Sequence, residues 1–104
     1  MRSGESGVRR RLNRPVWVDL SVVFRQTCYP PARFRWDDRT LDVSREVWGT
    51  LHGWYRASTG EWFGLVSYAV AYADVQVERQ LTLDDQLVPA EALRPRLYGR
   101  ERRA

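Results

Sequence analysis

The sequence predicts a small all-β domain: a barrel or roll of six to seven short strands with one helical turn near its C-terminal end. Short apolar stretches with period-two alternation recur through residues 16–93, which is typical of half-buried strands. Glycines, prolines and paired aspartates separate these stretches, as turns do. No long amphipathic helix is evident, and 104 residues suffice for one domain with one modest core.

The first strand is expected to begin abruptly after Pro15 and to run through Arg25. Two prolines close the segment that follows, and they favour an extended loop over residues 27–31. The apolar face of this strand would consist of Val16, Val18, Leu20, Val22 and Phe24.

A hairpin is expected over residues 32–43, with Asp37 and Asp38 as its two turn residues. In this register, the cross-strand pairs include a ring beside a guanidinium, two apolar side chains, and a cation beside an anion. The expected pairs are Trp36 with Arg39, Arg35 with Thr40, Phe34 with Leu41 and Arg33 with Asp42.

A longer hairpin is expected over residues 50–72, turning at Ser58-Thr59-Gly60. The small residues Ser67, Ala69 and Ala71 would share the face opposite the bulky ones, so we expect both faces to be covered. The bulky face would consist of Trp62, Val66, Tyr68, Val70 and Tyr72.

The last third of the chain predicts a strand over residues 75–83 and a turn at Asp84-Asp85-Gln86. A short strand at Leu87-Val88 follows. Pro89 suits the first position of a helical turn, which would continue through Leu93 until Pro95 ends it.

Two short motifs carry a resemblance to a known family. In GEWFGLVSYAV, Trp62, Gly64 and Val66 form a Trp-x-Gly-x-Val strand, and LVPAEALRPR follows it at a distance. On these motifs, residues 53–96 resemble the second half of small SH3-like barrels of the Tudor type. The resemblance implies a short final strand and a terminal helical turn. The chain is also similar to small uncharacterised bacterial proteins, which imply no function.

The charge of the chain is concentrated at its ends. Residues 1–15 hold five arginines and one acid, and residues 94–104 hold five arginines and one acid, so each end carries +4. The remaining residues carry −4, and the total is +4. We therefore expect a disordered arginine-rich arm at 1–15, a single β domain at 16–97 and an arginine-rich tail at 98–104.

Several functional classes find no support in the composition. The single cysteine, Cys28, cannot form an intrachain disulfide or a zinc cluster, and a lone thiol fits a reducing cytoplasm. The N-terminal segment lacks the apolar stretch of a secretory signal, and the longest uncharged run, from Trp62 to Ala73, is too short to span a membrane. We expect a cytoplasmic protein without cofactor, metal or membrane.

Catalytic residues are sparse. His52 is the one histidine, and a nucleophilic pair with Cys28 would need a third group to orient it. The aspartate pairs 37–38 and 84–85 lie at expected turns, where aspartates usually accept bonds from nearby amides. We do not expect an enzyme.

The remaining candidates concern binding. Exposed rings could hold cations or stack bases, although a chain without isoleucine also needs rings for its core. Of the crowded aromatics, Trp54 and Phe63 are expected to form an exposed patch. Arginines in the ends could contact phosphates without reading sequence, although solvated ends that aid solubility have the same composition. These candidates are Arg9, Arg10, Arg11, Arg14, Arg96, Arg100, Arg102 and Arg103.

The sequence therefore predicts a non-catalytic binding module whose arginine-rich tails contact nucleic acid. The alternative is a protein–protein adaptor that docks a partner through an exposed strand edge or aromatic patch. Salt dependence separates the two, because phosphate contacts give a steep salt slope and an apolar patch does not.

Overall fold

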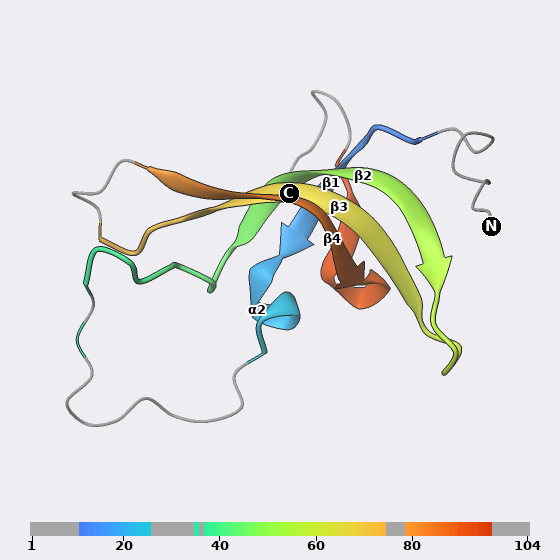
Figure 1. Cartoon of the computed structure of the whole chain (residues 1–104), viewed down its shortest axis with the longest axis horizontal. Coiled ribbons are helices and arrows are strands. Elements are labelled where there is room, and N and C mark those ends of the chain that lie inside the picture. The colour runs from blue at the N-terminus through green and yellow to red at the C-terminus, as the bar shows by residue number, and fades with distance from the viewer. Residues whose placement is uncertain (1–10, 26–34, 36, 75–78, 97–104) are drawn as a thin grey trace, which may run out of the picture.

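The computed structural model describes residues 11–25, 35, 37–74 and 79–96. These residues form one antiparallel sheet of five strands in the order β4-β3-β2-β1-β5, with little helix (Figure 1). The all-β prediction is confirmed. The sheet is not closed, because β4 and β5 are its two edges and not neighbours. The strands are β1 (Arg14–Asp19), β2 (Glu46–Arg56), β3 (Trp62–Ala71), β4 (Gln80–Pro89) and β5 (Leu93–Pro95).

The first expected strand is interrupted at Asp19. There β1 ends, and Leu20–Val23 form a helical turn, α2. The Asp19 carboxylate accepts hydrogen bonds from the amide and the hydroxyl of Ser21, at 3.1 and 2.6 Å. Such capping favours a helical turn over a continued strand. The expectation of a strand through Arg25 was therefore wrong beyond Asp19, and Phe24 is 43% exposed.

The sheet begins earlier in the chain than the apolar alternation does. Arg14 pairs with Leu51 of β2. Two residues before it, the Leu12 amide donates to the His52 carbonyl at 2.9 Å. The segment after Arg11 is thus already bonded to the sheet, and residues 1–10 of the expected arm lie outside the described residues.

The expected long hairpin is formed by β2 and β3. Gly60 supplies the left-handed conformation at its turn, with φ of 95°. The core face of β3 alternates as expected, but Trp62 was wrongly expected to be buried: its ring is 47% exposed. Trp62 is the first residue of β3 and pairs with Arg56, the last of β2, so it lies at the outer end of the hairpin. There the Arg56 guanidinium lies 5.0 Å from its ring centre.

Asp84 and Asp85 do not form the expected turn between two strands. Both lie inside β4, where the pairing with β3 shifts register between Val66 and Tyr68. Asp85 has a φ of 54°, and its amide donates to the Ser67 hydroxyl at 3.2 Å. Aspartate tolerates the left-handed region better than most residues. The pair therefore makes a bulge in one continuous strand.

The expected hairpin over residues 32–43 is described only in part, because Arg33, Phe34 and Trp36 lie outside the described residues. A turn is present, but the Thr40 amide donates to the Asp37 carbonyl, which centres it on residues 38–39. Leu41 bridges to Tyr72, the residue after β3. Hydrogen bonds from the Arg39 amide and the Thr40 hydroxyl lower the pKa of Asp37.

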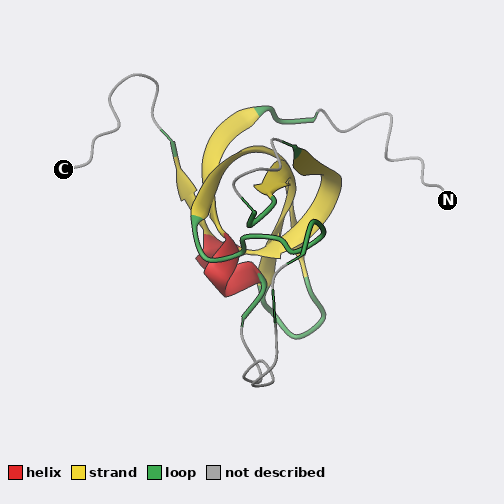
Figure 2. Cartoon of the chain, turned by 90° about the vertical axis from the view of Figure 1, so that its left-hand side faces the viewer, coloured by secondary structure: helices red, strands yellow, loops and turns green. Residues whose placement is uncertain are grey.

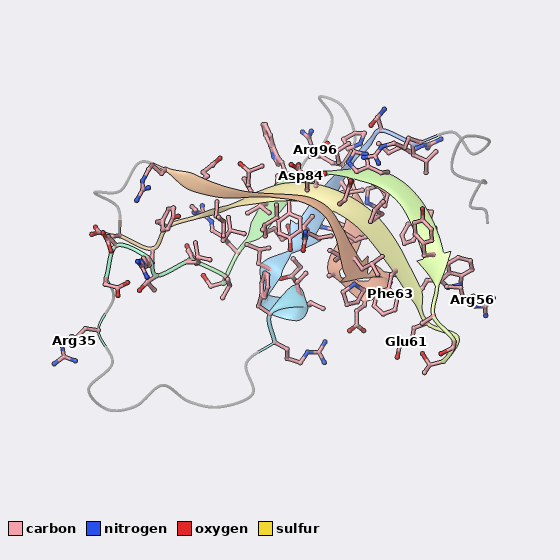
Figure 3. All side chains as sticks on the ribbon, viewed as in Figure 1. Arg35, Arg56, Glu61, Phe63, Asp84 and Arg96 are labelled. Carbon is pink, nitrogen blue, oxygen red and sulfur yellow. The ribbon has the colours of Figure 1, made fainter. Side chains whose placement is uncertain are left out.

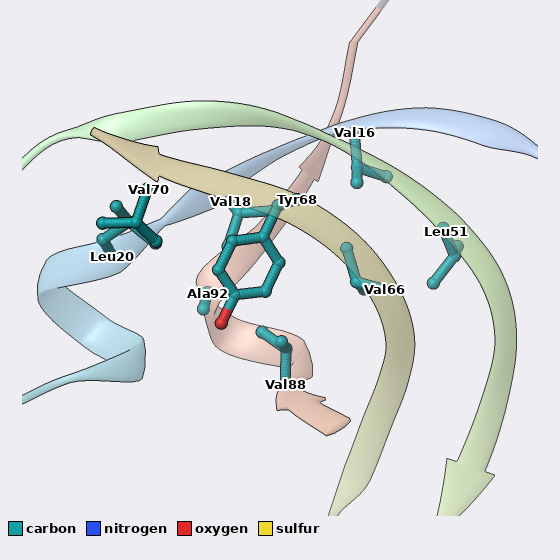
Figure 4. Close-up of a cluster of buried hydrophobic side chains, with 9 residues drawn as sticks. All are labelled: Val16, Val18, Leu20, Leu51, Val66, Tyr68, Val70, Val88 and Ala92. Carbon is teal, nitrogen blue, oxygen red and sulfur yellow. The ribbon is translucent and has the colours of Figure 1, made fainter. Parts of the chain in front are cut away.

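The core lies under the concave side of the arched sheet, where α2 and the 3-10 turn η1 (Ala90–Ala92) cover it (Figures 1 and 4). The expected helical turn after Pro89 is thus confirmed, although Leu93 already belongs to β5. Figure 2 shows the strands curling around this core. Burial raises the pKa of the Tyr68 hydroxyl. The buried apolar residues are Val16, Val18, Leu20, Leu51, Val66, Tyr68, Val70, Val88 and Ala92.

Candidate functional site

Two tryptophans stand on the convex face of the sheet, opposite the core. Val16 and Val18 point into the core, so Trp17 between them points outward. Trp17 pairs with Trp48 of β2 on one side and with Arg94 of β5 on the other. The two rings meet edge to face, with centres 6.3 Å apart. The Arg96 guanidinium lies over both rings. We call Trp17, Trp48, Arg94 and Arg96 the outer-face cluster.

The two arginines of the outer-face cluster are held differently. Arg94 makes a two-pronged ion pair with Glu46, at 3.0 and 2.8 Å, and lies 5.6 Å from the centre of the Trp17 ring. Arg96 stacks over Trp48 at 4.4 Å, and its Nε is buried without a hydrogen-bond partner. None of the described acidic side chains forms an ion pair with Arg96. As far as the structure describes the chain, its positive charge is therefore held by ring faces and not by a carboxylate.

A shallow groove lies beside this cluster. Trp48 is 63% exposed, the most exposed of the described large apolar side chains. The next strand, β3, presents the small side chains of Ala69 and Ala71 on the same face, which leaves space alongside the indole. The groove is lined by Trp17, Arg45, Glu46, Val47, Trp48, Ala69, Ala71 and Gln80.

A polar cluster lies farther along the convex face. His52 Nε2 lies 2.9 Å from the Ser67 hydroxyl, and His52 Nδ1 lies 3.3 Å from the Leu12 carbonyl. Because a carbonyl can only accept, Nδ1 is the donor and Nε2 accepts from Ser67. The Asp85 amide donates to the same hydroxyl, and the Arg11 guanidinium pairs with the Asp85 carboxylate at 2.9 Å.

A serine–histidine pair is one component of nucleophilic catalysis, but here the orienting partner of the histidine is a backbone carbonyl. The same bonds connect the N-terminal segment to β2, β3 and the bulge of β4. We interpret the polar cluster as the attachment of the N-terminal segment to the sheet. Cys28, the other residue considered for catalysis, lies outside the described residues.

The structure places three of the candidate phosphate-binding arginines. Arg11 is ion-paired and Arg14 is exposed at the start of β1. Arg96 stacks on Trp48 within the outer-face cluster, on the convex side in Figure 3. The other candidates, Arg9, Arg10, Arg100, Arg102 and Arg103, lie outside the described residues.

The expected aromatic pair is not brought together. Trp54 is 44% exposed and pairs with Gly64, whereas Phe63 is half-buried and pairs with Tyr55. Neighbouring residues of a strand point to opposite faces, so the two rings lie on opposite sides of the sheet. The sequence did not single out Trp17 and Trp48 instead. The available signal was the position of Trp17 between two core valines, while Trp48 lies before the point where its strand was expected to start.

Among the described residues, no group of three or more His, Cys, Asp or Glu side chains is arranged to hold a metal ion. No helix in the described part of the chain is long and apolar enough to cross a membrane. Comparisons of the chain with protein-family models, with curated proteins and with solved structures gave no match. The case for a function therefore rests on the residues of the convex face.

Proposed function

We propose that the protein is a non-catalytic binding module whose two arginine-rich ends hold nucleic acid through contacts independent of base sequence. One observation carries the proposal. The Arg96 amide donates to the Pro15 carbonyl at 3.2 Å, which joins the start of the C-terminal end to the start of β1. Residues 1–10 continue from Arg11, only four residues before Pro15. Both basic ends are thus attached to one sheet, through side chains on its convex face.

The charge distribution supports the same function. Each end carries +4, while residues 16–93 carry −4 and repel phosphate. A polyanion that meets one end is held near the other, which raises the effective concentration for the second set of contacts. Arginine contacts to phosphate release counterions and do not depend on base sequence. The expected affinity is weak at physiological salt and rises steeply as salt is lowered.

The finer fold assignment and the location belong to this proposal. An SH3-like barrel of the Tudor type is supported by the order of the last elements: the turn η1 is followed by the short strand β5, which lies beside β1. Such small barrels commonly serve as binding modules. A cytoplasmic location is supported by the single cysteine of the chain.

The function is tested by titrating a fluorescent duplex with the full chain over a range of salt concentrations. Replacing Arg9 and Arg10 with Gln should lower the slope of log affinity against log salt by up to about 2 units, near 0.9 per lost contact. The matched control, Arg25→Gln with Arg39→Gln, removes the same charge from the domain body and should leave the slope unchanged. Equal slopes in the tail variant and the unaltered chain would contradict the proposal.

The adaptor function remains the second candidate, and one observation favours it. Trp54, Tyr55 and Trp62 are 44%, 52% and 47% exposed at the outer end of the β2–β3 hairpin. A partner docked there would bury rings and depend little on salt. Trp54→Ala with Trp62→Ala would then abolish capture of a host protein, whereas neutral tails would not.

A further inference from the structure

We infer that the ligand of the outer-face cluster is single-stranded nucleic acid, with an unpaired base stacked on Trp48 and a neighbouring phosphate held by Arg96. The inference rests on the proposed function and names its substrate class. The tails explain attraction to any polyanion. The outer-face cluster adds a reason to prefer strands whose bases are free to stack.

Trp48 offers an open ring surface for stacking. Trp48 is 63% exposed, although the Arg96 guanidinium lies 4.4 Å from the centre of its ring and the Trp17 ring meets it edge to face. An indole left this open costs hydration free energy, which a stacked base would recover. Stacking on an aromatic ring accepts any base, so it agrees with contacts that ignore sequence.

The Trp48 ring is held in place by its neighbours on β1 and β5. Trp17 lies beside Trp48 in the pairing of β1 with β2, and the two-pronged Arg94–Glu46 ion pair stands over the Trp17 side of the cluster. Because both tryptophans lie on paired strands, the platform is fixed before a ligand arrives. A preformed platform lowers the ordering cost of binding.

The charge beside Trp48 is positive. Glu46 lies beside the outer-face cluster, and Arg94 neutralises its charge. Arg96 is left with a charge that no described carboxylate pairs, stacked directly on the exposed indole. A ring and a guanidinium without an ion-pair partner among the described residues, side by side, match a base and its phosphate side by side. This complementarity selects a nucleic-acid strand over an apolar peptide.

The selection of single strands follows from geometry. The bases of a duplex are stacked on one another, so none offers a free face to Trp48 without being pulled out of the helix. The groove beside Trp48, floored by Ala69 and Ala71, offers room for one flat group next to the indole.

The test compares full-length variants on a fluorescent oligothymidine and on a duplex of equal length. Trp48→Ala should weaken single-strand binding about 5- to 150-fold, as expected for one lost stacking contact, and should leave duplex binding unchanged. Trp48→Phe keeps a ring and should retain most of the affinity. The matched control is Trp54→Ala, which removes another exposed indole on the opposite side of the sheet and should change neither affinity. Thermal melts establish that each variant is folded.

Three results would overturn the inference, and they are distinguishable. If Trp48→Ala binds the single strand as tightly as the unaltered chain, with the same salt slope, the platform is refuted and tail binding stands. If Trp48→Ala weakens both ligands equally, Trp48 acts through the tails and not by stacking. If the full chain binds neither ligand even at low salt, the proposed function fails and the inference fails with it.

Discussion

Within the described part of the chain, the charge of Arg96 is stabilised by rings rather than by an acid. Its guanidinium lies 4.4 and 6.0 Å from the centres of Trp48 and Trp17. Contacts of this kind contribute about 0.5–1 kcal/mol at exposed sites, so they position the side chain without consuming its charge. Arg11, by contrast, is paired with Asp85 and contributes to attaching the N-terminal segment. Two arginines from the arginine-rich ends, Arg96 and Arg11, thus have different roles.

Gly49 of β2 lies where the sheet leaves no room for a side chain. A Cβ there would lie 2.8 Å from Val18 Cγ2 and 3.2 Å from the Ser67 carbonyl oxygen. Gly49→Ala should therefore cost about 1–3 kcal/mol through overpacking, measured by urea denaturation. At Gly53 the nearest atom would be 3.5 Å away, on Tyr55, so Gly53→Ala should cost much less. Equal losses at both glycines would show that the packing around Gly49 is wrong.

Asp42 should make stability depend on pH. Hydrogen bonds from the Ser44 hydroxyl (2.6 Å) and the Ser44 amide (3.1 Å) lower the pKa of the Asp42 carboxyl. A lowered pKa contributes stability that is fully present above the ordinary value and is lost as the pH falls through the folded one. Asp42→Ala should cost about 0.5–1 kcal/mol at pH 7, given its partial exposure. The two proteins should converge in urea melts as the pH falls below the folded pKa of Asp42. A constant difference even below that pKa would exclude the carboxylate as its source.

At the scale of elements, alternation predicts strand faces well and strand ends poorly. The core face of β3 and the turn before it follow from period-two burial and from Gly60. The end of β1 does not, because one carboxylate, Asp19, caps a helical turn within an unbroken apolar pattern. Asp84 and Asp85 illustrate the reverse case, since residues typical of turns form a bulge when Ser67 satisfies an amide.

The arginine-rich ends could be predicted from the sequence, whereas the outer-face cluster could not. The arginine runs are visible in composition alone. The outer-face cluster requires the pairing of β1 with β2 and β5, which brings Trp17, Trp48 and Arg94 into one row. Residues 31 and 77 positions apart along the chain meet there through long-range strand pairing, which no local pattern encodes.

The cap of α2 gives a prediction at the same scale. Asp19→Ala removes the acceptor for the Ser21 amide and should cost about 0.5–2 kcal/mol in denaturant unfolding. Asp19→Asn keeps an acceptor oxygen and should recover most of the loss. Asp38→Ala, a change of the same kind at an exposed turn, is the control. An Asp19→Ala variant as stable as the unaltered chain would remove the explanation for the end of β1.

For the whole molecule, the described fold already includes residues 11–15, ahead of the apolar alternation that starts at Val16. A chain of residues 11–96 should melt close to the full chain. A chain of residues 15–96 should melt several degrees lower, because it lacks the Leu12–His52 bond and the Arg11–Asp85 ion pair. Calorimetry of the two shortened chains checks this. Identical melting temperatures would show that residues 11–14 add nothing to the fold.

The central claim is that the two basic ends act together on a nucleic acid, and the salt dependence of single-strand binding tests it most directly. The full chain is compared with a variant in which five arginines are replaced with Gln: Arg9, Arg10, Arg100, Arg102 and Arg103. These changes lower the charge of the N-terminal end from +4 to +2 and that of the C-terminal end from +4 to +1. We expect the slope of log affinity against log salt to fall by up to about 3.5 units, at roughly 0.7 per phosphate contact on a single strand, with little binding left at physiological salt. An unchanged slope and affinity in that variant would contradict the account.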